Sequence, residues 1–323
     1  MTYLLDETAR REHKRRNAIH SVLLLIGLSL VLAFSATMIW GWAGLLWAAA
    51  GVGILMTAVP KVQPEAVMKM YRAQEVDPRL SSQLGRVVAL LSERADLPTQ
   101  PRLYVVPSHT LNAFATGNSK TAAVAVTDGL LRTLSLRELA GVLAHEISHI
   151  RNNDLSVMSI ADNISRFTQA LSTLATILAF LNIISLMVGL QLVSWAAIFV
   201  LYLAPMISSL LQLGLSRARE YDADLEAAML TGDPDGLISA LGKLERHTGR
   251  FWEDFAFPIP GRHVPGPSLL RSHPHTADRI ARLRELHGKP KLPPVVRQED
   301  AVAFPVPRHP LVSPRQHWSG VWY

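Results

Sequence analysis

The sequence predicts a mostly α-helical membrane protein in which four transmembrane helices form two hairpins and accompany a small α+β domain. Two observations predict this class. Charged residues make up 18% of the 323 residues, whereas soluble proteins contain about 25%. In addition, residues 17–60 and 167–216 contain no Asp, Glu, Lys or Arg. Because one helical crossing of a bilayer takes about 20 residues, each of these apolar stretches is long enough for two crossings.

Each apolar stretch has a turn signal near its middle, and basic residues flank it. Two Trp and two Gly residues cluster in residues 40–44, and Gly189 lies in the second stretch. Trp favours the boundary between water and lipid. By the positive-inside rule, the flanking Lys and Arg place the segments outside both hairpins in the cytoplasm. A cleavable signal peptide would need a site near residues 33–35, but the apolar run continues past them without a polar break.

Composition limits the kinds of partner and site. The chain has no cysteine, so a bound metal must be held by His, Asp or Glu. The net charge of +6 and the pI of 9.8 could indicate nucleic-acid binding. Much of the basic charge, however, flanks the apolar stretches, as in residues 10–16, where it is typical of a cytoplasmic anchor. We therefore expect the lipid bilayer, and no nucleic acid, as a partner.

The charge pattern divides the chain into six segments. Strands are expected at residues 103–106 and 122–126, and a helix from about Arg217 to Gly232. The segments are a basic N-terminus (1–16), a first transmembrane hairpin (17–59), a first soluble segment (60–168), a second hairpin (169–214), a second soluble segment (215–288) and a Pro-rich tail (289–323).

A helix predicted over residues 136–152 carries the clearest chemical motif. Ser135 and Glu138 form a capping-box pattern at its start, and its apolar residues fall on one face. The stretch His145-Glu-Ile-Ser-His149 fits the pattern HExxH. Residues four apart share a face of a helix, so both imidazoles can reach one ion.

The motif suits a catalytic zinc site. Neutral imidazole is a good ligand for Zn²⁺, and the carboxylate of Glu146 can take a proton from a water that the metal has activated. The alternative is a pair of solvated helix histidines. It is disfavoured because His145 lies opposite most of the apolar stripe and His149 at its border, which leaves both free to ligate.

A third ligand must come from another carboxylate or histidine. Glu220 and Asp224 are again four residues apart, in a segment that directly follows the second apolar stretch. A hairpin leaves and re-enters on one side of the bilayer, so this segment can return beside His149. The alternative for Glu220 is a surface acid that pairs with a neighbouring Arg, since such charge patterns are common on helices.

The order of motifs resembles that of the HtpX-like membrane zinc metallopeptidases, relatives of the CAAX prenyl endopeptidases. The resemblance covers most of residues 1–285. It rests on an N-terminal hairpin, the stretch from Asn112 to Gly117, the HExxH motif followed by Asp154, a second hairpin, residues 216–224 (Ser-Arg-Ala-Arg-Glu-Tyr-Asp-Ala-Asp), and Ser272-His-Pro274 leading to Arg279 and Ile280.

The resemblance implies roles for further residues. Glu220 is expected to be the third zinc ligand, and Asp224 to orient a ligand histidine, since ligating imidazoles normally need such a partner. The family's substrate cleft corresponds to Asn112, Ala113, Phe114 and Ala115, whose strand edge would pair with an extended substrate. His273 and Arg279 lie where a donor could stabilise an oxyanion or orient another group.

The expected function is that of a zinc-dependent endopeptidase with one Zn²⁺ per chain and a zincin-like catalytic domain. The resemblance implies a multi-pass protein of a bacterial inner membrane, with a cytoplasmic catalytic domain that cleaves misfolded or surplus membrane proteins. Peptides are further candidate substrates, and no feature of the sequence indicates an oligomer. Two alternatives are CAAX-type peptide processing, disfavoured because that family has more spans, and a catalytically silent membrane scaffold. The scaffold would have lost Glu146 or a ligand, and none is lost.

Overall fold

The computed structural model describes residues 7–58, 63–76, 82–187, 189–190, 193–253, 276–286 and 292–296. The chain divides into two compact units. One consists of residues 11–61 and 156–218, and is called the membrane unit below. The other consists of residues 1–10, 62–155 and 219–323, and is called the site unit.

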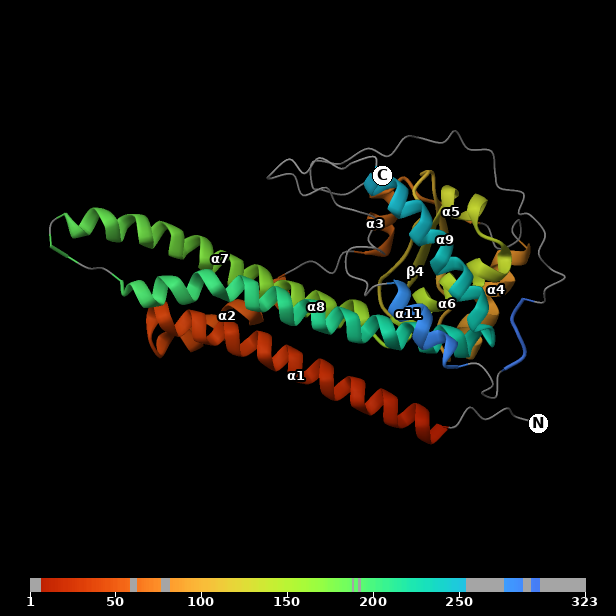
Figure 1. Ribbon diagram of the computed structural model, residues 1–323, viewed down its shortest axis with the longest axis horizontal. Helices are drawn as coiled ribbons and strands as arrows, with labels where there is room; N and C mark the ends of the chain where they lie inside the picture. Colours follow the sequence, from red (N-terminus) through yellow and green to blue (C-terminus); the bar gives the residue numbers. More distant parts are fainter. Residues whose placement is uncertain are drawn as a thin grey trace. The chain divides into compact units, whose positions relative to one another are not determined.

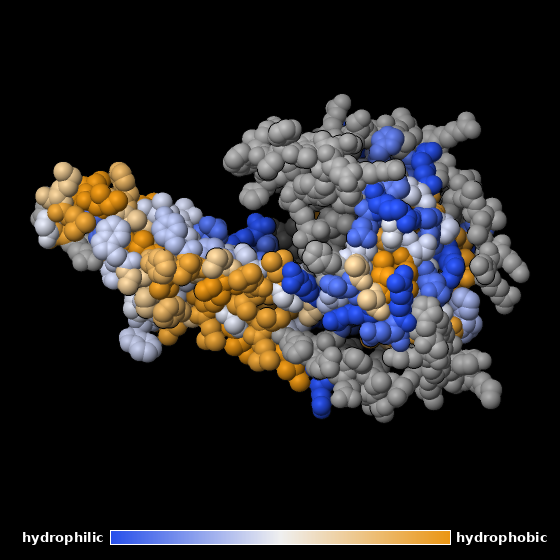
Figure 2. Space-filling view, in the orientation of Figure 1, coloured by the Kyte–Doolittle hydropathy of each residue, from blue (hydrophilic) through white to orange (hydrophobic). Residues whose placement is uncertain are grey.

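Among the described residues, four helices build the membrane unit, and three of them continue beyond it. Three of the described helices are long and apolar enough to cross a bilayer: α1 from Ser21 onward, α7 and α8. Large apolar side chains such as those of Phe180 and Phe199 are each 64% exposed on them, and Figure 2 shows hydrophobic residues gathered along these helices. The helices are α1 (Glu7–Trp40), α2 (Ala43–Ala58), α7 (Asp154–Leu186) and α8 (Trp195–Thr231).

The sequence predicted four spans, and the described residues supply three. The remaining helix, α2, has 16 residues, which is about 24 Å at 1.5 Å per residue and less than a hydrocarbon core of about 30 Å. The expected turns are found between these helices: α1 ends at Trp40, and Gly189 adopts a φ of +74° after the end of α7.

Small residues and a few polar contacts hold the membrane unit together. A Cβ atom added to Gly51 of α2 would lie 2.7 Å from the ring of Phe167 on α7, so these two helices touch closely. The Tyr202 hydroxyl of α8 donates to Thr176 Oγ1 of α7 at 2.9 Å. The Asn182 side chain donates to the Val193 carbonyl at 2.8 Å. The paired course of α7 and α8 is visible in Figure 1.

The site unit contains a four-stranded sheet with the order β1-β2-β4-β3. The strands β2 and β4 are parallel, whereas β1 and β3 are antiparallel to their neighbours. Strand β3 pairs only with β4 in this sheet and so forms one edge of it. The two strands expected from the sequence are β2 and β4. The strands are β1 (Gln74–Glu75), β2 (Arg102–Val106), β3 (Ala113–Thr116) and β4 (Ala123–Thr127).

The sheet separates two apolar layers. Alternate residues point to opposite faces of a strand, so Val124 and Val126 join the main core with α6, while Ala123 and Ala125 pack with Met68 of α3 on the other face. The described helices of this unit, apart from the ends of α1, α7 and α8, are α3 (Pro64–Met70), α4 (Ser82–Arg94), α5 (Asp128–Thr133), α6 (Leu136–Arg151), α9 (Pro234–Glu253) and α11 (Thr276–Arg284).

Helix α6 lies at the centre of the site unit and begins as the sequence predicts. The Ser135 side chain accepts from the Glu138 N–H, and the Glu138 side chain accepts from the Ser135 N–H, which completes the capping box. The same Glu138 carboxylate accepts from Ser239 at 2.6 Å and from Lys243 at 2.7 Å, both on α9. One buried carboxylate therefore starts α6 and joins it to α9.

Gly141 permits α6 and α9 to approach closely. A Cβ atom at this position would lie 2.9 Å from both Cα and N of Leu237 on α9. Because backbone atoms cannot move aside as a side chain can, we expect Gly141→Ala to lower the free energy of unfolding by about 1–3 kcal/mol. Urea unfolding of the full-length chain in detergent measures this loss. Gly242→Ala is the control: nothing lies within 4 Å of its Cβ position, so unchanged or slightly higher stability is expected.

The long helices differ from the sequence prediction at one end each. We expected a separate helix to start near Arg217, but α8 runs without a break from Trp195 to Thr231. Likewise, α7 already begins at Asp154. The charged stretches beside the apolar ones contain good helix formers and no Gly or Pro, so nothing in them stops a helix. The predicted end at Gly232 is correct, and this glycine has a φ of +68°.

Candidate metal centre

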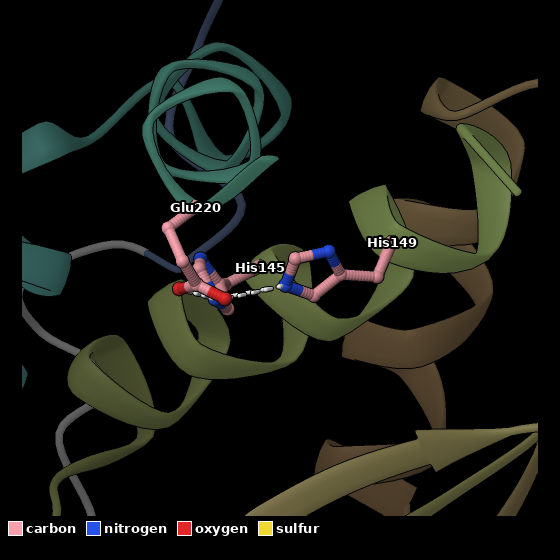
Figure 3. A group of neighbouring side chains, drawn as sticks. All are labelled: His145, His149 and Glu220. Carbon is pink, nitrogen blue, oxygen red and sulfur yellow. Dashed lines mark hydrogen bonds and ion pairs between the residues drawn. The ribbon is translucent and has the colours of Figure 1, made fainter. Parts of the chain in front are cut away.

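His145, His149 and Glu220 converge in the site unit. The two histidines lie on consecutive turns of α6, and Glu220 comes from α8. Figure 3 shows the carboxylate of Glu220 facing both imidazole rings. One ligand atom from each of the three residues can be chosen so that all lie within 4.8 Å of one another. Sequence positions more than 70 residues apart, as counted from the numbering, thus form a single cluster.

The distances in this cluster are close to those of a tetrahedral metal site, and Glu220 approaches each histidine with a different oxygen. The Nε2 atoms of His145 and His149 are 3.2 Å apart. Glu220 Oε2 lies 3.4 Å from His145 Nε2, and Glu220 Oε1 lies 3.6 Å from His149 Nε2. In a tetrahedral zinc site with bonds of about 2.0–2.2 Å, neighbouring donor atoms are about 3.3–3.6 Å apart. The donor set of two imidazoles and one carboxylate also leaves a fourth position, as catalytic zinc sites do.

Asp224 contacts the Nδ1 atom of His145, and Arg279 in turn bonds to Asp224. Its Nδ1 lies 3.1 Å from Asp224 Oδ1, and Asp224 follows Glu220 by one turn of α8. Arg279 of α11 donates to both oxygens of Asp224 at 2.6 Å and is itself only 4% exposed. The same guanidinium lies 3.8 Å from Glu220. Asp224 therefore lies where the resemblance predicts an orienting residue, and Arg279 contacts the carboxylates of Asp224 and Glu220.

The surrounding carboxylates make His145 strongly basic. Burial lowers the pKa of this imidazole, but hydrogen bonds to Asp224 and Glu220 and their negative charges outweigh burial and raise the pKa to about 10. Without a metal the ring is therefore protonated at neutral pH. Since a metal binds the neutral ring, a metal ion must displace a proton here.

His149 has a corresponding pair of supporting residues, which the sequence reasoning did not assign. Its Nδ1 lies 2.8 Å from Asp154 Oδ2. Arg219 donates to the other oxygen of Asp154 at 2.6 Å. A signal for Asp154 existed in the sequence, because an acid in the first turn after the motif helix is close enough in the chain to turn back onto it. Nothing in the sequence alone pairs it with Arg219.

Glu146 is buried beside the histidines. Burial raises the pKa of its carboxyl group, although the neighbouring His145 and His149 oppose this. The backbone N–H of Ala115 donates a hydrogen bond to the carboxylate. The edge strand β3 is therefore in direct contact with the residue that the motif identifies as a proton acceptor.

Of the other residues expected at the site, four lie in or directly before β3, and one lies outside the described residues. Ala113, Phe114 and Ala115 lie in β3, and Asn112 directly precedes it. The Phe114 ring packs against Tyr71 with a centroid separation of 4.8 Å, on the face of the sheet away from α6. His273 lies outside the described residues, as do most of the Pro-rich tail and residues 254–275.

The sequence is similar to those of known proteins. Residues 78–287 match the model of peptidase family M48. A protease HtpX homolog of Paraburkholderia phytofirmans is 39% identical over 235 residues, which cover 68% of this chain and 79% of that protein. A protease HtpX homolog of Desulfatibacillum aliphaticivorans is 36% identical over 281 residues, which cover 83% and 89%.

A solved structure is similar at a lower level. The crystal structure of S. mikatae Ste24p matches with 18% identity and a TM-score of 0.47, over 84% of this chain and 66% of that one. This likeness is too low to carry an argument about the site. The family match and the HtpX homologs confirm the resemblance found in the sequence. The chain belongs to peptidase family M48, as an HtpX-like membrane metalloprotease.

Proposed function

We propose that this protein is a zinc-dependent endopeptidase that hydrolyses membrane proteins and peptides. The observation that carries the proposal is the meeting of His145, His149 and Glu220 at distances suited to one zinc ion. Glu146 is buried beside them, on the helix that carries both histidines. These are the three ligands and the general base that metal-assisted hydrolysis needs.

Each side chain has a distinct task in this proposal. His145, His149 and Glu220 hold the ion, and Asp224 orients His145. When bound, zinc activates a water molecule and polarises the scissile carbonyl group. Glu146 accepts a proton from the attacking water and transfers it to the leaving amine nitrogen. The N–H of Ala115 holds the Glu146 carboxylate in place for both transfers.

The edge of β3 opposite β4 is the proposed binding site for the substrate backbone. The Asn112 carbonyl accepts from the Thr127 N–H at 3.0 Å and so faces β4. Because these directions alternate along a strand, the backbone groups of Ala113 and Ala115 face the edge. The Ala115 N–H already donates to Glu146, so a substrate would pair with Ala113 and with the Ala115 carbonyl. An extended peptide that pairs with this edge, along residues 112–115, would pass close to Glu146.

The proposed membrane arrangement is supported by the residues that lie before α7 and near the end of α8. Two crossings return the chain to the side on which it started, and His149 before α7 and Glu220 near the end of α8 lie in one compact unit. We propose that α2 completes a fourth span and that the Lys and Arg flanking the hairpins place the site unit in the cytoplasm of a bacterial inner membrane. Misfolded or surplus membrane proteins are the proposed substrates, and no nucleic acid is involved.

Metal content tests the catalytic proposal. Purified full-length protein in detergent should contain about one zinc ion per chain, the number that one such site holds, and His149→Ala should lose it. His247→Ala is the matched control, because His247 is exposed. Its Nδ1 lies 3.1 Å from the Lys243 carbonyl of its own helix. Folded wild-type protein that takes up no zinc would refute the proposal.

Turnover in cells tests the proposed substrates. Glu146→Gln keeps the ligands and removes the base, so membrane proteins that are normally cleaved should accumulate in cells that carry this variant. Quantitative proteomics of the membrane fraction, with wild type and variant expressed equally, measures the difference. Equal abundance of every membrane protein in the two strains would argue against a role in their turnover and would favour a silent scaffold.

A further inference from the structure

The second histidine of the metal centre is held by two residues that come from different helices. His149 Nδ1 lies 2.8 Å from one oxygen of Asp154, and Arg219 donates to the other at 2.6 Å. The side chains of Asp154 and Arg219 are 3% and 14% exposed. Water therefore has little access to this pair, and charge-assisted hydrogen bonds are strong in such surroundings.

The local backbone directs Asp154 toward the histidine. Helix α6 ends at Arg151, and Asn153 takes a left-handed conformation with a φ of +56°. Asn tolerates this conformation better than most residues. The turn that results starts α7 at Asp154, whose carboxylate reaches back to the imidazole four residues before the turn. The short turn at residues 152–154 thus places the Asp154 carboxylate within hydrogen-bonding distance of His149.

Arg219 connects this contact to the third ligand. It directly precedes Glu220 on α8, so the bond from Arg219 to Asp154 ties the start of α7 to the helix that carries Glu220. The arrangement matches that of His145, where Asp224 accepts from Arg279. Each imidazole is therefore backed by one Asp, and each Asp is backed by one Arg from another helix.

We propose that Asp154 and Arg219 are positioning residues for the metal centre. Asp154 holds the proton of His149 on Nδ1 and the ring in one orientation, so that Nε2 presents its lone pair to the ion. Arg219 fixes Asp154 and, through the same bond, the distance between His149 and Glu220. This inference rests on the proposed function, because it assumes that the three ligands hold zinc.

Zinc affinity of the full-length protein in detergent tests the inference. We expect Asp154→Asn to weaken zinc binding by about 10–100-fold, the usual effect of removing such a partner, when affinity is measured by competition with a chromophoric chelator. Arg219→Gln should weaken binding in the same direction. Asp128→Asn is the matched control, because Asp128 is also buried, at 2% exposure, and bonded to an arginine, Arg132, at 2.7 Å.

Two further measurements separate positioning from a merely structural role. The visible absorption spectrum of protein loaded with Co²⁺ reports ligand geometry and should change in Asp154→Asn but not in Asp128→Asn. Urea unfolding with excess chelator shows whether each variant folds without metal. A purely structural role would lower this stability and leave both metal affinity and the cobalt spectrum at their wild-type values.

The outcomes distinguish this inference from the proposed function. If the wild type binds about one zinc ion, as one site should, and Asp154→Asn and Arg219→Gln bind it equally tightly, only the inference is overturned. If Asp154→Asn does not fold, Arg219→Gln decides by the same criterion. A folded wild type that binds no zinc overturns both.

Discussion

Replacing Glu146 with Gln should slow peptide-bond hydrolysis by about 10²–10⁴-fold, the usual contribution of a general base. Gln has nearly the same shape as Glu and accepts the same hydrogen bond from Ala115, but it cannot take a proton from water. The ligands His145, His149 and Glu220 are unchanged, so zinc should remain bound. Cleavage of a quenched fluorescent peptide by the full-length protein, with zinc measured on the same sample, gives both quantities.

Glu226→Gln is the control for this substitution. Glu226 is also a buried acid, at 9% exposure, and it bonds to Asn152 at 2.6 Å and to Arg151. Its loss should leave the rate per folded molecule near that of the wild type. Glu146→Gln protein that cleaves at the wild-type rate with zinc bound would exclude Glu146 as the base.

Replacing Arg279 with Met should lower the free energy of unfolding of the metal-free protein by about 3–5 kcal/mol. The guanidinium is 4% exposed, bonds to both oxygens of Asp224 and lies 3.8 Å from Glu220. Without it, two buried carboxylates would lose their main permanent positive charge and gain no access to water. Urea unfolding of the full-length chain in detergent with chelator measures the loss.

The next arginine on the same face of α11 provides the comparison. Arg282 is exposed and lies over the ring of Tyr221, with 3.7 Å from its guanidinium carbon to the ring centroid. An exposed cation–π contact contributes about 0.5–1 kcal/mol, so Arg282→Met should have a much smaller effect. Equal losses for the two variants would mean that α11 stabilises the protein by general packing and that the buried charge of Arg279 has no special role.

The features that the sequence predicted well depend on local chemistry. The capping box of α6 involves residues three apart, and both of its hydrogen bonds are present. The pairing of His145 with His149 follows from the pitch of a helix. The strands β2 and β4 stand out as short apolar runs in the sequence. The meeting of Glu220 with the histidines needed more, namely that two crossings return the chain to its starting side.

The features that the sequence could not supply depend on contacts between distant elements. Arg219 looks like any of several arginines near the second apolar stretch, and only the fold brings it to Asp154. Arg279 was one of two candidates for an oxyanion donor or an orienting residue, and its bonds to Asp224 are visible only when α11 lies against α8. The start of α7 and the continuation of α8 past Arg217 were also misjudged, because charge marks a bilayer boundary and does not stop a helix.

The proposed pairing of a substrate with the edge of β3 limits what this enzyme can cleave. Main-chain amides are the same in every polypeptide, so pairing along Ala113 and Ala115 recognises conformation more than residue type. A segment whose amides are already paired within a helix or between two strands has none left to pair with β3. Under the proposed mode of recognition, a segment would be bound only after it has lost its native hydrogen bonds, and a folded neighbouring protein would not be cleaved.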